Sequence, residues 1–347
     1  MPSTSTTMAM PEPRRVPVPA SGTDDRPVLE VRDLTVTFLP PKRRPITVVD
    51  GLSLDLHAGR AHALVGESGS GKSVSMRALM GLLPQARVTG SATLRGDAVG
   101  DAELVGMPAS SMRSVRGARI GMIFQNAMDA MNPTLTVETQ LCEPLLWHGL
   151  CDREEASRRA VEALRAVGIP EPERRVKMYP FQLSGGMRQR VMIAMATIVK
   201  PEIVIADEPT TALDVTVQLQ ILDLLNDLKK QGMAIVMITH DLGVARYFCD
   251  DISVLYSGQI VEQGTIDEVL DGPLHPYTEG LRGSVLELGD DSPLHTIPGQ
   301  PPDPSAAPRG CRFAPRCPLV EDRCLQPQPL IQVGDRTARC WKATDRG

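Results

Sequence analysis

Residues 66–73 read GESGSGKS and decide the fold, because they match the phosphate-binding pattern G-x-x-x-x-G-K-[ST]. Glycines let the backbone turn tightly enough to aim several N–H groups at phosphate oxygens, and a helix that follows adds its positive end. We predict that Lys72 reaches the β- and γ-phosphates of a nucleotide and that Ser73 ligates Mg²⁺. The residues predicted to contact the nucleotide from this P-loop are Gly66, Ser68, Gly69, Ser70, Gly71, Lys72 and Ser73.

The flanks of this loop have the strand before it and the helix after it that a true P-loop requires. The apolar run Ala61 to Val65 predicts a short buried strand, and Lys72 to Leu83 predicts a helix that Pro84 ends. Farther upstream, apolar and polar residues alternate from Leu29 to Phe38 and again from Thr47 to Leu56. Both segments therefore predict half-buried strands.

A second acidic element lies well downstream, where the apolar run Ile203 to Ala206 ends in Asp207 and Glu208. An Asp at the end of a strand can hold Mg²⁺ directly or through water. Glu208 would then face the γ-phosphate and orient the attacking water. Alone, such a pair is more typical of a solvated loop. Together with the P-loop, it indicates hydrolysis of ATP.

Patterns of strands and helices alternate through the last part of this region. Residues 203–206, 217–228, 234–238 and 251–256 predict strand, helix, strand and strand in turn. Such alternation predicts a parallel sheet covered by helices. Residues 126–200 are predicted to be mainly helical, and Asp152 is predicted to cap one helix, with Glu155 reaching back to it and Gly168 ending it.

The composition is that of an ordinary globular protein: 347 residues, 42% hydrophobic, 23% charged and a net charge of −5. The negative charge argues against a nucleic-acid partner. No apolar run approaches the roughly 20 residues of a membrane-spanning helix, and no signal peptide is predicted. We therefore expect a cytosolic protein whose 7 cysteines are free or metal-bound. Residues 1–27, rich in Pro, Ser and Thr, are predicted to be a disordered tail.

Residues 183–190, LSGGMRQR, lie between the P-loop and the acidic element and resemble the signature motif of ABC ATPases. Three further markers of that family are found in the family's order. Gln125, before the signature motif, resembles the Q-loop glutamine, and after it Asp214 resembles the D-loop aspartate and His240 the switch histidine. The resemblance covers the chain from about residue 29 onward. It implies an α/β fold, a P-loop ABC-type ATPase domain with a mixed sheet core and a helical subdomain.

The domain boundaries implied by the resemblance are an ATPase domain at residues 28–270, with its helical subdomain at about 126–182, and a small cysteine-bearing C-terminal extension at 271–347. The catalytic residues implied are Glu208, His240 and Gln125, of which His240 would contact the γ-phosphate and Gln125 would touch Mg²⁺ or the attacking water.

The resemblance also implies ATP contacts made between two subunits that dock head to tail. The turn Ser184-Gly185-Gly186 of one subunit, together with Asp214, would contact the nucleotide held by the P-loop of the other. For the adenine ring the family uses an aromatic residue upstream of the P-loop, and Phe38 is the candidate. A Phe in the core of a strand is an equally good interpretation of Phe38.

Residues 179–194, 274–278 (LHPYT) and 297–302 (IPGQPP) resemble the ATPases of oligopeptide and dipeptide permeases. This implies import of short peptides. The implied partners are a second, distinct ATPase subunit, two transmembrane permease subunits and, indirectly, an extracytoplasmic binding protein, with this chain peripheral to the cytoplasmic membrane face. Related importers of nickel or other small solutes carry the same extension, so the cargo stays open. A non-transport ABC ATPase is a weaker alternative, because the chain has neither a coiled-coil insertion nor a second ATPase domain.

Four of the cysteines, Cys311, Cys317, Cys324 and Cys340, lie in the last stretch of the chain and form a candidate metal site. Their spacing is wider than that of zinc ribbons. Thiolate tetrads suit Zn²⁺ or an iron–sulfur cluster, and the tail resembles those of relatives proposed to hold a [4Fe–4S] cluster. Three interpretations therefore stay open: a cluster, zinc, or free thiols that can form a redox disulfide.

Overall fold

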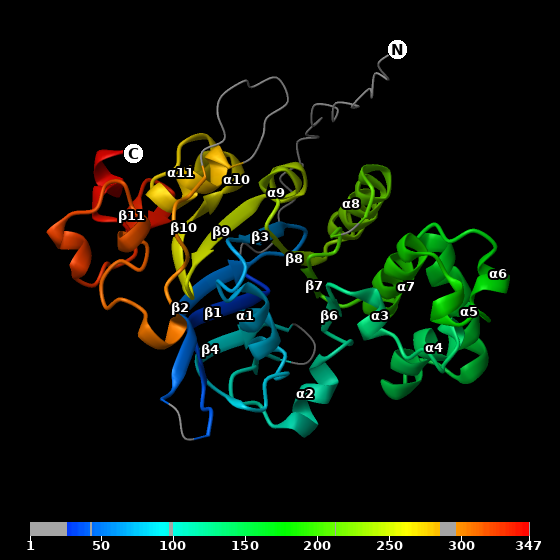
Figure 1. Ribbon diagram of the computed structural model, residues 1–347. Coiled ribbons are helices and arrows are strands. Elements are labelled where there is room, and N and C mark those ends of the chain that lie inside the picture. Colours follow the sequence, from blue (N-terminus) through cyan, green and yellow to red (C-terminus); the bar gives the residue numbers. More distant parts are fainter. Residues whose placement is uncertain (1–25, 42–43, 97–99, 212, 285–295, 347) are drawn as a thin grey trace, which may run out of the picture.

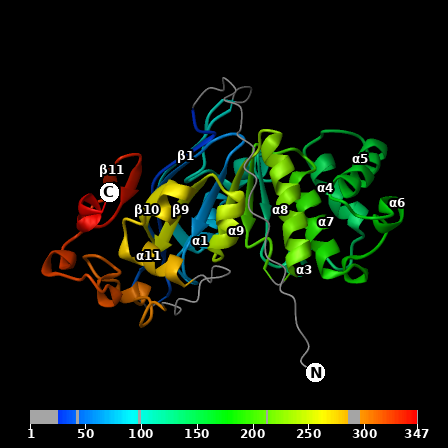
Figure 2. The same ribbon diagram turned by 90° about the horizontal axis from the view of Figure 1, so that it is seen from above.

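The computed structural model describes residues 26–41, 44–96, 100–211, 213–284 and 296–346. Nearly all of the predicted N-terminal tail lies outside these residues. The described chain forms two sheets with helices packed on them (Figure 1). The helices from α3 Ala127–Ala130 to α7 Gly185–Thr197, called the helical subdomain below, extend past the predicted bounds of about 126–182. They and the C-terminal extension lie at opposite ends of the molecule in both views (Figures 1 and 2).

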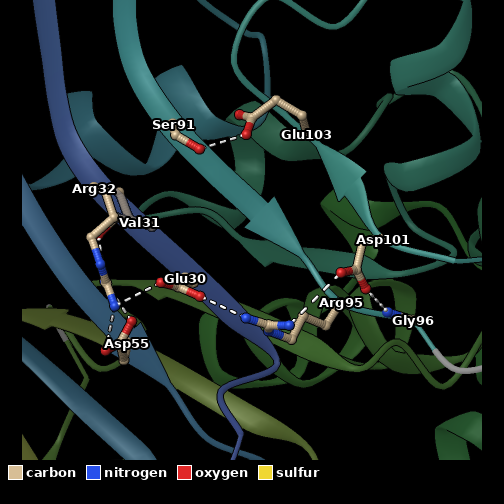
Figure 3. A network of polar contacts seen from close by, with 9 residues as sticks. All are labelled: Glu30, Val31, Arg32, Asp55, Ser91, Arg95, Gly96, Asp101 and Glu103. Atoms are coloured by element: carbon tan, nitrogen blue, oxygen red, sulfur yellow. Dashed lines mark hydrogen bonds and ion pairs between the residues drawn. The ribbon is translucent and has the colours of Figure 1, made fainter.

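The smaller sheet is antiparallel and has the strand order β2-β1-β4-β5. Its strands are β1 Leu29–Phe38, β2 Ile46–Leu56, β4 Ala86–Leu94 and β5 Ala102–Glu103. Charged side chains join the strands across one face (Figure 3): Arg32 pairs with Asp55 at 2.6 Å, and Glu30 pairs with Arg95 at 2.8 Å. These pairs are solvent-exposed to a large degree, so each contributes about 0–1 kcal/mol and mainly fixes the strand register.

The larger sheet has eight strands in the order β11-β12-β10-β9-β3-β8-β7-β6. Its strands are β3 Ala61–Val65, β6 Ile120–Ile123, β7 Ile203–Asp207, β8 Ala234–Thr239, β9 Asp251–Tyr256, β10 Gln259–Thr265, β11 Ile331–Val333 and β12 Arg336–Ala338. Strands β9, β3, β8, β7 and β6 run parallel, and β10, β12 and β11 are added antiparallel. The predicted mixed sheet is confirmed, and the extension contributes two of its strands.

Helices cover the larger sheet and build the subdomain beside it (Figure 1). They are α1 Lys72–Leu79, α2 Ala109–Val115, α3 Ala127–Ala130, α4 Val137–Trp147, α5 Arg153–Ala166, α6 Pro172–Arg175, α7 Gly185–Thr197, α8 Val215–Lys230, α9 Leu242–Phe248, α10 Ile266–Asp271 and α11 Pro276–Gly283. Among the described residues, no helix is both long enough and apolar enough to cross a membrane.

Strand β7 shows how the parallel strands hold the core together. Ile203 and Ile205 pack toward the antiparallel sheet and α1, while Val204 and Ala206 pack toward the helical side. A strand buried on both faces has no polar alternation, which is why this run is continuously apolar. Its carboxyl end is therefore rigid, and Asp207 and Glu208 are placed there.

Two local predictions need correction. Helix α1 ends at Leu79 instead of continuing to Leu83, because Gly81 turns left-handed at φ 59° and Leu82 donates its N–H to Arg77 O. Asp152 caps α5 as predicted, accepting from Glu155 N at 2.9 Å. The Glu155 carboxylate, however, pairs with arginines of the next helical turn and does not reach back to the cap.

Candidate active site

The P-loop joins the end of β3 to the start of α1, and two of its glycines are required by geometry. A Cβ on Gly66 would lie 2.1 Å from Leu255 O, and one on Gly71 would lie 3.0 Å from Val48 O. Both residues also have positive φ, 147° and 105°. Side chains at either position would therefore displace the loop from the strands it packs on.

Lys72 and Ser70 are the polar groups that this loop offers to a ligand. Lys72 is buried, and its Nζ donates to Gly66 O at 2.7 Å and Glu67 O at 3.0 Å. Burial lowers the pKa of Lys72, and nearby carboxylates oppose that shift. Ser70 Oγ is buried without a hydrogen-bond partner among the described residues. A buried, unpaired hydroxyl beside a buried ammonium fits a site for phosphate oxygens.

Asp207 and Ser73 meet beneath the P-loop. Ser73 Oγ donates to Asp207 Oδ1 at 2.7 Å, and Asp207 is only 1% exposed. Arg77 Nη2 lies 3.4 Å from the other carboxylate oxygen. A hydroxyl and a carboxylate are the hard oxygen donors that Mg²⁺ prefers, so the residues present fit the predicted ion.

Glu208 collects the predicted catalytic residues around its carboxylate. Gln125 Nε2 donates to it at 2.9 Å, Thr211 Oγ1 donates at 3.0 Å, and His240 Nδ1 lies 3.3 Å away. These side chains come from three separate segments of the chain. The ends of the parallel strands β6, β7 and β8 bring the segments together. Sequence reasoning missed Thr211, whose only sequence signal is its place just after Glu208.

The backbone of Glu208 is strained. Its φ is 49°, a left-handed value that non-glycine residues rarely adopt, and it precedes a proline. The Glu208 N–H donates to Ile238 O at 2.9 Å, which holds the residue against β8. Strain of this kind, maintained by surrounding structure, is typical of residues whose side chain must point in one fixed direction.

The signature turn lies apart from the P-loop of its own chain. Ser184 caps α7 by accepting from Met187 N at 3.4 Å, and Asp214 caps α8 by accepting from Val217 N at 3.0 Å. Helix α7 packs with the helical subdomain and lies away from α1 in both views (Figures 1 and 2). The far side of α7 approaches the acidic element, where Gln189 Nε2 donates to Pro209 O at 2.6 Å, whereas the hydrogen bonds of Ser184 and Asp214 go to the starts of their own helices.

Phe38 lies at the end of β1, opposite Ile46 and Ala86. Its ring is half-buried and packs against the core between the two sheets. Packing in the core is therefore enough to explain an aromatic residue at this position. Its predicted contact with adenine stays a prediction.

The four tail cysteines are neighbours, but they do not form a metal site as placed. Cys311 N donates to Cys324 O at 2.7 Å, and Trp341 Nε1 donates to Cys324 Sγ at 3.4 Å. Burial raises the pKa of Cys311 to about 11 and also raises the pKa of Cys317 and Cys340. Metal ligation needs thiolates, and no group of three or more potential ligands with metal-binding geometry occurs among the described residues.

Comparison with known proteins agrees with this geometry. The family model of the ABC transporter matches residues 49–211, and that of the oligopeptide/dipeptide transporter C-terminal region matches residues 261–324. The chain is 46% identical to the oligopeptide transport ATP-binding protein OppD of Salmonella typhimurium, covering 92% of this chain and 94% of that protein. It is 44% identical to the oligopeptide transport ATP-binding protein AppD of Bacillus subtilis, covering 92% and 98%.

Solved structures lead to the same class. The dimeric structure of MJ0796, a bacterial ABC transporter cassette, superposes with a TM-score of 0.60 at 30% identity, over 69% of this chain and 98% of that one. Fold and site together define an ABC-type ATP hydrolase. Within that class, the chain belongs to the oligopeptide/dipeptide branch of the ABC transporter ATP-binding proteins.

Proposed function

We propose that this chain binds and hydrolyses ATP to power the import of short peptides through a membrane ABC transporter. The observation that carries the proposal is the convergence of Gln125, Thr211 and His240 on Glu208, beside a P-loop with an unpaired buried hydroxyl. Similarity to peptide-transport relatives over more than nine-tenths of the chain supports the cargo.

In this proposal the P-loop binds the triphosphate of ATP. The backbone N–H groups around Gly69 and Gly71 and the N-terminus of α1 surround the phosphates, and Lys72 exchanges its two carbonyl partners for phosphate oxygens. Ser73 and Asp207 would hold Mg²⁺, which would supply positive charge to the phosphates. Lys72 and Ser73 thereby fix the position of the γ-phosphate.

Glu208 then acts on the attacking water. Its strained backbone and its contact with β8 fix the carboxylate where it accepts a hydrogen bond from that water. His240 and Gln125 release their contacts with Glu208 and turn to the γ-phosphate and the water. Positioning of this kind provides most of the catalysis in phosphoryl transfer.

Helix α7, which Ser184 caps, lies away from α1 in both views, and this supports a dimeric site (Figures 1 and 2). A second ATPase subunit, similar but distinct, would place its signature turn over the P-loop of this chain, and the turn of this chain would do the same in return. ATP binds the closed dimer better than the open one, so it drives closure, and hydrolysis releases it. The ATPase pair lies at the cytoplasmic face of the membrane, and this cycle changes the conformation of two transmembrane permease subunits. An extracytoplasmic binding protein delivers the peptide to those subunits.

Uptake of labelled short peptides tests the function. In cells that depend on this chain, Glu208→Gln is expected to reduce uptake at least about a hundredfold while ATP binding persists. Glu202→Gln is the matched control, because Glu202 lies on the surface and pairs with Arg119. Unchanged peptide uptake in the Glu208→Gln strain would overturn the peptide cargo. Normal ATP hydrolysis by that variant would overturn the catalytic role.

For the tail, we propose that four cysteines together bind one iron–sulfur cluster: Cys311, Cys317, Cys324 and Cys340. The closeness of the four cysteines, whose charges act on one another, supports this proposal. Iron and sulfide analysis of chain purified without oxygen decides the matter. A content of less than about 0.2 iron atoms per chain would overturn the cluster. Zinc found in place of iron would identify the four cysteines as a zinc site instead.

A further inference from the structure

The C-terminal extension contacts the P-loop through Arg316, a residue that the sequence motifs do not mark. Arg316 ends the short turn Ala314–Arg316 and is 8% exposed. Its Nη1 lies 2.9 Å and 3.1 Å from the two carboxylate oxygens of Glu67, the second residue of the P-loop. A contact of this kind, between a buried guanidinium and a carboxylate, is among the stronger polar contacts in proteins.

Arg316 is held in place from several sides. Its Nε donates to Pro298 O at 2.8 Å, and its Nη2 donates to Ile297 O at 3.3 Å. Its Nη1 also lies 3.2 Å from the hydroxyl of Tyr256 on β9. The guanidinium is therefore fixed between the extension and the ATPase core, and it cannot leave Glu67 without losing these other partners.

The backbone of Glu67 is held by the extension as well. Glu67 N donates to the hydroxyl of Tyr277 on α11 at 2.9 Å. Nearby, Arg312 donates to Ser257 O, while Gly258 N donates to Ser70 O at 2.8 Å. Both the start and the middle of the P-loop are thus fixed by residues that contact, or belong to, the extension.

Electrostatics explains why this fixation matters for a phosphate site. A carboxylate inside the P-loop repels a polyphosphate unless a cation neutralises it. Lys72 cannot serve both groups, because it is needed by the phosphates and already bonds the carbonyl of Glu67. Arg316 supplies the second positive charge from the side of Glu67 that faces the extension.

We propose that Arg316 is a positioning residue for ATP: it neutralises Glu67 and holds the P-loop in its binding form, so the extension sets the ATP affinity. The inference rests on the proposed function only in taking the P-loop as the ATP site. It assigns the extension a role inside the ATPase cycle, whatever the cargo is.

The test is titration of the full-length chain with a fluorescent ATP analogue. Arg316→Ala is expected to weaken binding on the order of tenfold, because it leaves the half-buried Glu67 carboxylate beside the phosphates without its cation. Arg316→Lys keeps the charge and is expected to recover most of the affinity. In the Glu67→Gln background, where no charge needs neutralising, Arg316→Ala is expected to cost less than about threefold.

A matched control separates this role from general loss of structure. Arg323→Ala removes an arginine of the same extension that lies over the Trp341 ring, and it is expected to leave ATP affinity unchanged. Thermal melting without nucleotide is measured for every variant, and the Arg316→Lys rescue identifies an effect of charge.

Two results would overturn the inference. Wild-type affinity in Arg316→Ala would show that the contact does not position the loop. An equal loss in the presence and absence of Glu67 would show that Arg316 does not act through that carboxylate. Failure of the wild-type chain itself to bind the analogue is a different result: it would overturn the proposed function, and this inference with it.

Discussion

The P-loop, residues 66–73, and the cysteine segment, residues 311–317, face each other across the contact between Glu67 and Arg316. They use their polar groups in opposite ways. In the P-loop, Ser70 Oγ is buried without a hydrogen-bond partner among the described residues. In the cysteine segment, the backbone N–H of Cys311 and the terminal nitrogens of both arginines have protein partners, although Arg312 Nε is also buried without one among the described residues.

This difference indicates that the P-loop binds a ligand, whereas the cysteine segment supports the residues around it. Unpaired buried polar groups cost free energy in the empty protein, and a ligand recovers that cost when it binds. A segment most of whose polar groups are already bonded gains less from a ligand and mainly fixes its neighbours. The comparison predicts large functional effects from changes in the P-loop and small ones from changes to the thiols.

The largest effect is expected at Gly66. Replacement by Ala places a Cβ 2.1 Å from Leu255 O at a φ of 147°, so we expect a loss of at least about 3 kcal/mol in the free energy of unfolding. Gly69→Ala is the control, because Gly69 also has positive φ but a Cβ added there would meet no atom within 4 Å, and about 1–2 kcal/mol is expected. Urea unfolding measures both, and equal losses would contradict the role of close packing.

Lys72→Ala is expected to weaken ATP binding about a hundredfold, because one buried charge-assisted contact to the phosphates is lost. Lys342→Ala, which removes a lysine of the tail that pairs with Glu321, is the matched control. Calorimetric titration of ATP measures both constants. A similar loss in the two variants would remove the distinction between the binding loop and the tail.

Unfolding at low pH tests whether the ATPase core and the C-terminal extension unfold together. Burial lowers the pKa of His62 on β3 to about 4 and that of His275, which caps α11, to about 3. Below pH 6.5 the unfolded chain therefore binds protons that the folded chain does not, and stability falls as pH decreases. We expect each histidine to cost about 2 kcal/mol at pH 5 relative to pH 8.

Urea unfolding at the two pH values checks this prediction. His62→Gln and His275→Asn are each expected to remove part of the pH dependence from a single transition. Two separate transitions, each sensitive to one histidine, would show that the extension and the core unfold independently.

The smallest effect is expected at Cys317. Its thiol is half-buried, and burial raises its pKa, so it is neutral and makes no contact with the P-loop through its sulfur in the described structure. Cys317→Ser should therefore change ATP affinity less than about twofold. A tenfold loss of ATP affinity would mean that the thiol acts on the neighbouring Arg316. Changes in the cysteine segment would then affect ATP binding almost as strongly as changes in the P-loop.

The sequence predicts those parts of the site that local patterns determine. Strands β1, β3 and β9 have the predicted bounds. Ser73 contacts Asp207, and Gln125 and His240 contact Glu208, while their predicted roles toward ATP stay predictions. The predicted end of α1 is wrong because a left-handed Gly81 stops the helix before Pro84. Arg316 could not be found because no local pattern specifies which distant carboxylate a buried arginine will meet.

The contact between Arg316 and Glu67 also has a consequence for the order in which the chain is made. Its two residues are 249 positions apart. At about 5–20 residues per second, a ribosome needs roughly 12–50 s to add the second after the first. During that time the newly made P-loop has its own glycines and lysine but not the arginine that neutralises Glu67. On the proposed role of Arg316, full ATP affinity therefore arises only after Arg316 has been added and has reached Glu67.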